Sequence, residues 1–144
     1  MIISKVQDFV LPKSISLNLN NSPDIAQTIA VSCFGLGVNC ELSGLKTLKI
    51  KETDRLIALK NELEKLGAEV NVTKDSISVN SQNSIKKDII INTYNDHRMA
   101  MAFAPLGLKT RITIKNPIVV GKSYPLFWDH LHQIGFKIEK DVNF

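Results

Sequence analysis

Apolar and polar residues alternate over residues 15–20, near the amino end of the chain. Ile15, Leu17 and Leu19 are each followed by one polar residue. Because successive side chains of a strand point to opposite faces, this spacing predicts a half-buried strand. The next run, Ser22-Pro23-Asp24, combines a capping hydroxyl, a proline suited to the first helical position and a first-turn carboxylate. It therefore predicts the start of a helix.

Two helices are predicted in the next part of the chain. The first runs from Asp24 to Phe34 and ends at Gly35 or Gly37. The second runs from Thr53 to Leu66, where leucines recur every three or four residues and Gly67 supplies a left-handed stop. The inward-facing residues are expected to be Ile25, Ile29 and Cys33 on the first helix and Leu56, Leu59, Leu63 and Leu66 on the second.

Strand and helix patterns continue toward the carboxy end. A hairpin is predicted around Lys74-Asp75, because apolar residues alternate with polar ones over 70–72 and again over 77–79. A strand and two further helices are expected at Asp88–Asn92, Asp96–Leu106 and Pro125–Gln133. Pro105 should kink the middle helix or end it early, and its buried residues are expected to be Met99, Phe103 and Leu106. This order of strands and helices predicts an α/β fold.

Composition places the chain among ordinary globular proteins. It has 144 residues, 44% hydrophobic and 22% charged, so we expect a single domain over 1–144 with no internal linker. The formal net charge of +4 suits anionic partners. Aromatic residues are not interleaved with a basic stripe, which argues against a nucleic-acid partner. Without a signal sequence or a run of ~20 apolar residues, we expect a cytoplasmic protein with no membrane partner.

The cysteines and histidines favour neither a disulfide nor a metal site. Cys33 and Cys40 form no CxxC pair, so reduced structural thiols are expected. His130 and His132 lie on the last predicted helix without companion ligands. A metal site at these histidines is therefore not expected.

The segment Lys51-Glu52-Thr53-Asp54-Arg55 places two cations where the second helix begins. Lys51 and Arg55 are four residues apart and so lie on one side of a helix. Cations in a first turn oppose the helix dipole, but the arrangement becomes favourable when an anion binds there. Two interpretations remain open: an anion site, or a solvated helix face on which Glu52 and Asp54 neutralise their neighbours.

Two later segments have a similar character. Asn95-Asp96-His97-Arg98 sets an arginine in a first turn after a capping carboxylate, and arginine suits bidentate capture of carboxylate or phosphate. His97 alone is as consistent with packing as with proton transfer. Lys122 follows Gly121, but Asn116 stands where a phosphate loop would need glycine. Lys122 is therefore interpreted as a flexible ammonium at a loop-to-helix junction.

Four features occur in a specific order: Pro23-Asp24-Ile25-Ala26-Gln27-Thr28, Lys51-Glu52-Thr53-Asp54-Arg55-Leu56, Asn95-Asp96-His97-Arg98-Met99-Ala100-Met101-Ala102, and Lys122. Together they resemble the carboxy-terminal domain of the 5-enolpyruvylshikimate-3-phosphate synthases, from about Ile15 to Ile138. A sister family that acts on UDP-N-acetylglucosamine lacks this pairing of motifs. The resemblance implies about two βαβαββ-like units of a pseudo-threefold, inverse α/β barrel. The chain would then be a partial carboxy-terminal domain of a two-domain enzyme.

The resemblance also implies a reaction. The family transfers the enolpyruvyl group of phosphoenolpyruvate to the 5-hydroxyl of shikimate 3-phosphate and releases phosphate, a step of the shikimate pathway to chorismate and aromatic amino acids. The hydroxyl adds to C2 while C3 is protonated, without a metal or organic cofactor. Such a site must neutralise an anionic enol ester and hold acid and base groups in place.

Site residues follow by match to the family motifs. Phosphoenolpyruvate would be bound by Arg55, Arg98 and Lys122. Shikimate 3-phosphate would be bound by Asp24 and Lys51. All of these side chains, together with Glu52, are expected to converge on one face of the molecule.

Catalytic roles are implied in the same way. Asp24 is the candidate base at the 5-hydroxyl, whereas Glu52 and Lys122 are candidates for protonating C3 and for serving the leaving phosphate. The surrounding cations should keep the Glu52 carboxylate ionised. His97 is expected to act only through neighbouring side chains. Thr47 stands where many family members have an asparagine near the substrate.

We expect the chain alone to be inactive, because the amino-terminal domain would supply further binding residues and close over the substrates. An apolar face left uncovered would favour self-association of the fragment. Two other classes stay open: a catalytically inert anion-binding module, and a structural or assembly fragment.

Overall fold

A βαβαββ unit makes up the first half of the chain in the computed structural model, which describes residues 1, 4, 7–81 and 84–139. Its elements are β1 (Ser14–Asn18), α1 (Ala26–Leu36), β2 (Asn39–Ser43), α2 (Arg55–Leu66), β3 (Glu69–Val72) and β4 (Ile77–Asn80). The short 3-10 helices η1 (Pro23–Ile25) and η2 (Lys46–Ile50) precede the two α-helices. The predicted α/β class is confirmed.

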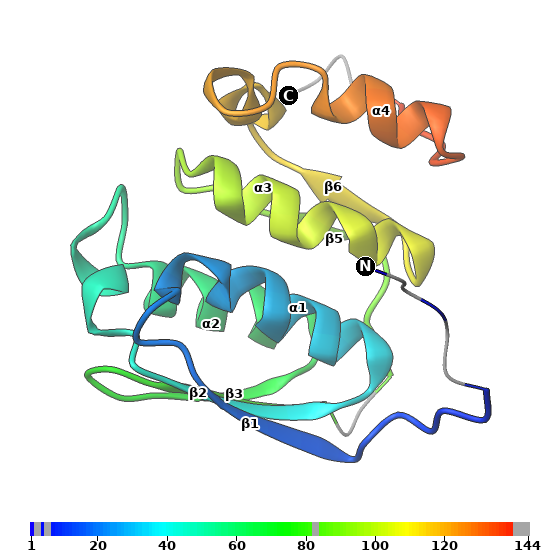
Figure 1. Ribbon diagram of the computed structural model, residues 1–144. Coiled ribbons are helices and arrows are strands. Elements are labelled where there is room, and N and C mark those ends of the chain that lie inside the picture. Colours follow the sequence, from blue (N-terminus) through cyan, green and yellow to red (C-terminus); the bar gives the residue numbers. More distant parts are fainter. Residues whose placement is uncertain (2–3, 5–6, 82–83, 140–144) are drawn as a thin grey trace.

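The four strands form one sheet in the order β1-β2-β4-β3 (Figure 1). β1 and β2 are parallel, so the chain needs a crossover between them, and α1 supplies it. β4 runs antiparallel to both β2 and β3. In the β3–β4 hairpin, Val70 pairs with Val79 and Val72 with Ile77. The predicted hairpin is therefore confirmed.

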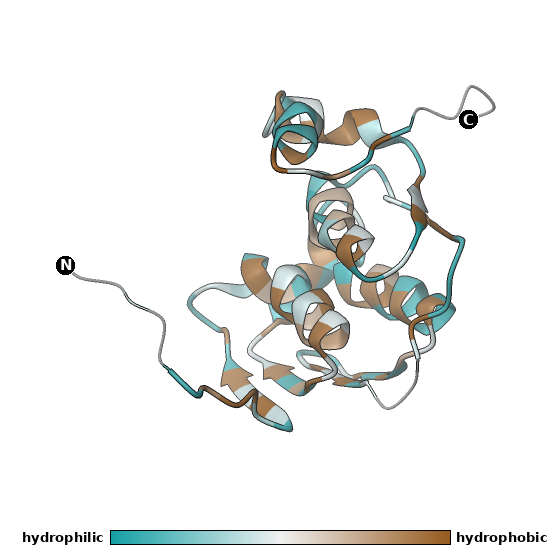
Figure 2. Cartoon of the chain, turned by 90° about the vertical axis from the view of Figure 1, so that its right-hand side faces the viewer, coloured by the Kyte–Doolittle hydropathy of each residue, from teal (hydrophilic) through white to brown (hydrophobic). Residues whose placement is uncertain are grey.

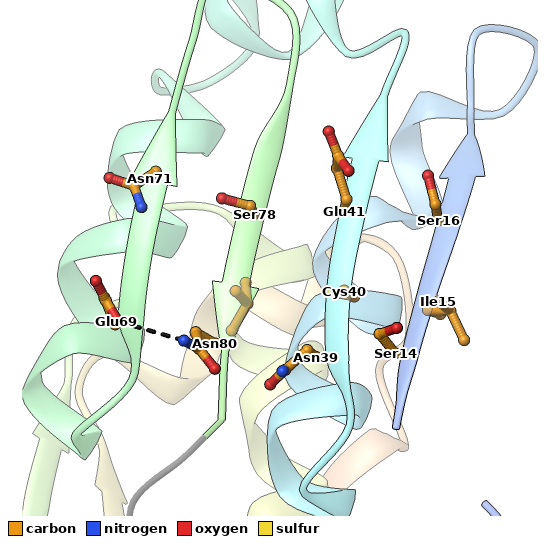
Figure 3. A pocket seen from close by; sticks show the side chains of 11 residues that line it. Ser14, Ile15, Ser16, Asn39, Cys40, Glu41, Glu69, Asn71, Ser78 and Asn80 are labelled. Carbon is orange, nitrogen blue, oxygen red and sulfur yellow. Dashed lines mark hydrogen bonds between the residues drawn. The ribbon is translucent and has the colours of Figure 1, made fainter. Parts of the chain in front are cut away.

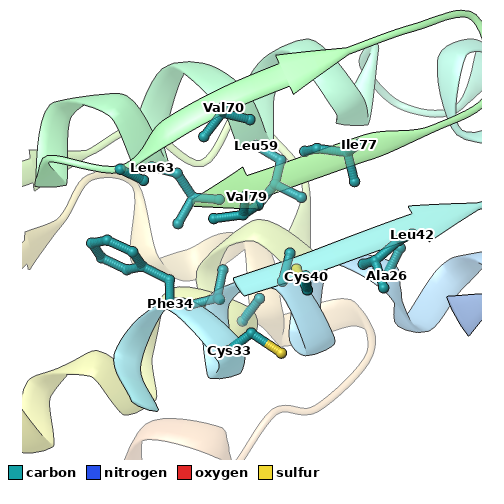
Figure 4. Packing of buried hydrophobic residues seen from close by; sticks show 14 of the residues in the cluster. Ala26, Cys33, Phe34, Cys40, Leu42, Leu59, Leu63, Val70, Ile77 and Val79 are labelled. Atoms are coloured by element: carbon teal, nitrogen blue, oxygen red, sulfur yellow. The ribbon is translucent and has the colours of Figure 1, made fainter. Parts of the chain in front are cut away.

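Both α1 and α2 cover the same face of this sheet, and the apolar core lies between (Figures 1 and 2). Figure 4 shows Leu59 and Leu63 of α2 beside Val70 and Val79 of the hairpin. All four leucines predicted to face inward on α2 are completely buried. Each contributes about 1.5 to 3 kcal/mol relative to an exposed position. Gly67 ends the helix in the left-handed conformation (φ 105°), as predicted.

The opposite face of the sheet is polar. Ser16, Glu41, Asn71 and Ser78 stand on it from four different strands (Figure 3). An antiparallel or mixed sheet commonly has one face on the core and one in water. The core therefore lies only on the helical side.

A shorter unit follows and packs on the helices of the first (Figure 1). It comprises β5 (Ile89–Ile91), α3 (His97–Phe103), η3 (Ala104–Leu108), β6 (Ile112–Ile114), η4 (Pro117–Lys122) and α4 (Phe127–Gln133). β5 and β6 are parallel, and within residues 84–139 no hairpin completes the unit. The described chain thus holds one whole βαβαββ unit and the beginning of a second. α1 contacts α3, and α2 contacts β5.

The first predicted helix differs from the structure in its start and in its buried face. Residues 23–25 form the 3-10 turn η1, and α1 proper begins at Ala26 and stops at Gly37 (φ 72°). The prediction that Ile25 faces inward is wrong, since its side chain is 46% exposed. The buried face instead includes Ala26 and Ala30, because α1 lies between the sheet and α3 and small side chains permit that close approach.

The bounds of α2 and α3 also differ from the predicted ones. α2 begins at Arg55, because the Asp54 carboxylate accepts hydrogen bonds from the backbone N–H groups of residues 56 and 57 and so caps the helix. α3 ends at Phe103 and continues as η3, as expected from Pro105, which has no N–H to donate. Leu17 is 39% exposed, since β1 is an edge strand of the sheet. Met99, Phe103 and Leu106 are buried, as predicted.

Cys33 and Cys40 are free, buried thiols, as predicted. Burial, reinforced by the neighbouring Cys33, raises the pKa of Cys40 to about 12. Among the residues that the structure describes, no helix combines the length and the apolar character needed to cross a membrane.

Candidate functional site

Three helix starts meet around one carboxylate. Asp24 lies in η1 just before α1, Arg55 is the first residue of α2, and Arg98 is the second residue of α3. Both arginines donate hydrogen bonds to Asp24. The expected convergence of these elements on one site is therefore present, and the two arginines do not lie on opposite sides of the molecule.

Arg55 is almost completely buried, with 2% of its side chain exposed. Its Nε donates to Asp96 at 2.5 Å, its Nη1 to Asp24 at 2.9 Å and its Nη2 to Glu52 at 2.6 Å. A guanidinium has five N–H donors and no acceptor, so a buried one must be surrounded by oxygens. Three carboxylates provide those oxygens here.

Asp96 is the residue of this cluster that sequence reasoning missed. It was interpreted only as the cap of the third helix, and it does accept a hydrogen bond from the Arg98 backbone N–H at 2.8 Å. Its carboxylate is also fully buried and holds the Nε edge of Arg55. Because Arg55 lies 41 positions away along the chain, only the folded structure reveals this second contact.

Asp24 links the buried part of the cluster to its exposed rim. Its carboxylate is 37% exposed and lies 2.9 Å from Arg55 Nη1, 3.3 Å from Arg98 Nη2 and 3.6 Å from Lys51 Nζ. Arg98 also donates to the backbone oxygen of Asp24 at 3.3 Å. Lys51 and Arg98 are each 36% exposed. They are therefore the cations that face solvent.

The charges within the cluster balance. Its cations are Lys51, Arg55 and Arg98, and its carboxylates are Asp24, Glu52 and Asp96. Cations at helix starts are unfavourable by themselves, and here carboxylates offset them. An incoming anion would have to replace one of these carboxylates, and the part-exposed Asp24 and Glu52 can move more easily than the buried Asp96.

Glu52 has fewer cationic neighbours than expected. It was predicted to be surrounded by three cations, but in the described structure only Arg55 forms an ion pair with it. Its side chain is 49% exposed, so water reaches the rest of the carboxylate. Arg55 is therefore the main cationic partner of Glu52 among the described residues.

Three other predicted residues lie outside the cluster or at its edge. Lys122 ends η4 and is exposed, and its side chain makes no hydrogen bond or ion pair within the described part of the chain. His97 is part-buried, with its Nδ1 4.0 Å from the Asp96 carboxylate. Thr47 is exposed in η2. The structure thus gathers Asp24, Lys51, Glu52, Arg55 and Arg98 but not Lys122.

Helix starts that gather cations around part-exposed carboxylates are an arrangement that small anions favour. A family model described as EPSP synthase (3-phosphoshikimate 1-carboxyvinyltransferase) matches residues 4–131. The chain belongs to this family, and the resemblance inferred from its motifs is confirmed.

Individual relatives agree with the family match. A 3-phosphoshikimate 1-carboxyvinyltransferase of Bacteroides fragilis is 48% identical over 120 residues, which cover 81% of this chain and 29% of the relative. One from Neisseria meningitidis is 36% identical over 118 residues, which cover 81% of this chain and 27% of the relative. The structure of an EPSP synthase from Acinetobacter baumannii superposes with a TM-score of 0.72 at 26% identity. The superposition covers 82% of this chain and 28% of that structure. The chain therefore spans less than a third of these relatives' length.

Proposed function

We propose that this chain contributes part of the active site of an enzyme that transfers the enolpyruvyl group of phosphoenolpyruvate to the 5-hydroxyl of shikimate 3-phosphate and releases phosphate. One observation carries the proposal: Lys51, Arg55 and Arg98 meet at Asp24. Both substrates are multiply charged anions, so a preformed group of cations is the main electrostatic requirement. Family membership supports the same assignment.

Arg55 and Arg98 are the proposed ligands of phosphoenolpyruvate. Asp96 accepts from the Nε and, at 3.4 Å, from the Nη2 of Arg55, while Nη1 donates to Asp24 and Nη2 also to Glu52. A phosphate or carboxylate that replaced either carboxylate would gain charge-assisted, bidentate hydrogen bonds. Lys122 would join this group only after η4 moves or the remainder of the enzyme is added.

The proton transfers remain assigned by family match. Asp24 is the proposed base at the 5-hydroxyl, and with Lys51 it would contact shikimate 3-phosphate. Glu52 and Lys122 are the proposed groups for protonating C3 and for serving the leaving phosphate, and His97 would act through Asp96. Glu52 is half-exposed and within reach of an anion on Arg55, which supports its candidacy.

We further propose that the chain is a partial carboxy-terminal domain of a two-domain, cytoplasmic enzyme. The match covers less than a third of each of these relatives, which supports a contribution from other segments to the same site. Exposed Leu36 and Leu108 border an apolar groove between α1 and η3. This groove would favour self-association of the chain, and sedimentation over a range of concentrations would detect it.

A phosphate-release assay with both substrates tests the proposal on the chain itself. We expect no turnover, because catalysis requires both reactants to be held about 3 to 3.5 Å apart and the rest of the enzyme supplies part of that grip. Release that depends on both substrates and disappears in Glu52→Ala would contradict the predicted inactivity. Salt-sensitive binding of random oligonucleotides without any response to phosphoenolpyruvate would favour an inert anion-binding module instead.

A further inference from the structure

A second buried charge lies on the same side of α2 as Arg55. Glu62 follows Arg55 by seven residues, which is two helical turns, and its side chain is fully buried. Burying a carboxylate is costly unless donors satisfy its oxygens. None of the residues that bond to Glu62 also bonds to Arg55 in the described structure, so the burial of Glu62 must be explained by its own partners.

Those partners come largely from the segment that follows β5. The Tyr94 hydroxyl donates to Glu62 Oε1 at 2.7 Å, and the Asn92 backbone N–H donates to Oε2 at 3.1 Å. Lys65 on α2 completes the set, with its Nζ 2.7 and 2.6 Å from the two oxygens. Burial, together with the hydrogen bond to Glu62, raises the pKa of Tyr94, so its hydroxyl remains a donor. Glu62 thus fastens residues 92–94 to α2.

The same short segment ends in the residue that holds Arg55. Tyr94 and Asn95 both adopt left-handed backbone conformations (φ 53° and 56°), and the Asp96 N–H donates to Thr93 oxygen at 2.8 Å. Residues other than glycine adopt this conformation consecutively only where surrounding contacts impose it. The resulting turn places the Asp96 carboxylate against Arg55 and at the start of α3.

We propose that Glu62 and Tyr94 are positioning residues for the anion site. They fix the turn 92–96 on α2 and thereby set where Asp96 grips Arg55, two helical turns from Glu62. The effect on Arg55 follows from these contacts alone, whereas the effect on anion binding rests on the proposed function. A carboxylate that merely stabilised the packing of α2 on β5 would leave the Arg55 contact unchanged.

The test uses Tyr94→Phe and Glu62→Gln, each in the whole chain, with Tyr124→Phe as the matched control. The control loses a hydroxyl that bonds to His130 and touches no residue of the cluster. Two quantities are measured: the NMR signal of the Arg55 Nε–H, assigned by its loss in Arg55→Lys, and the dissociation constant for inorganic phosphate. We expect both variants to shift the Arg55 signal and to weaken phosphate binding by about three- to tenfold. The control should change neither.

Circular dichroism establishes that each variant is folded before these comparisons are made. If Tyr94→Phe does not fold, the measurements on Glu62→Gln test the proposal. This variant is the milder change, because its amide oxygen still accepts one hydrogen bond. Folded variants with reduced stability but an unchanged Arg55 signal would overturn the proposal. A shifted Arg55 signal in a chain that binds no phosphate would uphold the positioning role and count against the proposed function.

Discussion

Arg55 and Arg98 illustrate how one sequence signal leads to two different environments. Both follow an acidic capping residue in the first turn of a helix, and both were predicted to bind the same anion. Arg55 is 2% exposed and bonds to three carboxylates, whereas Arg98 is 36% exposed and, among the described residues, its side chain bonds only to Asp24. Burial, rather than the motif, separates an anchored cation from one that is open to solvent.

This difference indicates a division of labour within the cluster. The buried contact between Arg55 and Asp96 connects α2 to α3 and so joins the two structural units. The exposed contacts of Asp24 with Lys51 and Arg98 form the rim that a ligand would meet first. Substitutions on the buried side and on the exposed side of the cluster should therefore have different effects.

The largest effect is expected from Arg55→Met. Removing one partner of a buried ion pair leaves Asp96 buried without its counter-charge, which costs about 3 to 5 kcal/mol in the free energy of unfolding. Arg98→Met should cost less than about 1 kcal/mol, because an exposed pair contributes little. Urea unfolding of both variants measures the difference. Arg111→Met, which removes an exposed pair with Asp88, is the control. Equal losses of unfolding free energy in Arg55→Met and Arg98→Met would contradict the distinction between a buried and an exposed arginine.

The first unit should also be sensitive to high pH through its buried thiol. The unfolded Cys40 thiol loses its proton near ~8.5, whereas the folded one holds it up to about 12. Between these values the unfolded state binds fewer protons, so stability falls as pH rises, by at most about 1.4 kcal/mol per pH unit. Urea midpoints from pH 8 to 11 should therefore decline, and Cys40→Ala should flatten the decline. An identical slope in Cys40→Ala would assign the effect to other groups.

A smaller effect is expected at the rim. Asp24 occupies the position on Lys51, Arg55 and Arg98 that an anion would take. Asp24→Asn should therefore tighten phosphate binding by about three- to tenfold, because a neutral amide competes less well for the cations. Asp88→Asn makes the same change in net charge elsewhere and should leave the affinity nearly unchanged. Isothermal titration measures both, and weaker binding in Asp24→Asn would mean that the carboxylate itself contacts the ligand.

Local patterns were enough to predict much of the fold. The leucine stripe and Gly67 defined α2, and the alternation over 70–79 defined the hairpin and its pairing. The inward face of the first helix was predicted correctly at Cys33 and, as a part-buried residue, at Ile29, but wrongly at Ile25. The small residues of α1 that pack close to α3 were missed, because α3 comes from a distant part of the chain. Sequence spacing contains no direct information about such a contact.

The candidate site was predicted only in part, because its remaining contacts also join distant parts of the chain. Motif positions identified five side chains that the structure brings together, but they gave no means of separating Lys122, whose position depends on how η4 packs on α3. The contact of Asp96 with Arg55 and the hydrogen bonds of Glu62 to the segment after β5 were not predicted, because they join segments 30 or 41 residues apart.

The central claim is that three helix starts form one anion site. It is tested most directly by following the backbone amide signals of the whole chain by NMR during titration with phosphoenolpyruvate. We expect the amides beside Lys51, Arg55 and Arg98 to shift together with a single dissociation constant, and added salt to weaken binding. Shifts at these three positions with different dissociation constants, or shifts confined to remote lysines such as Lys74 and Lys137, would contradict it.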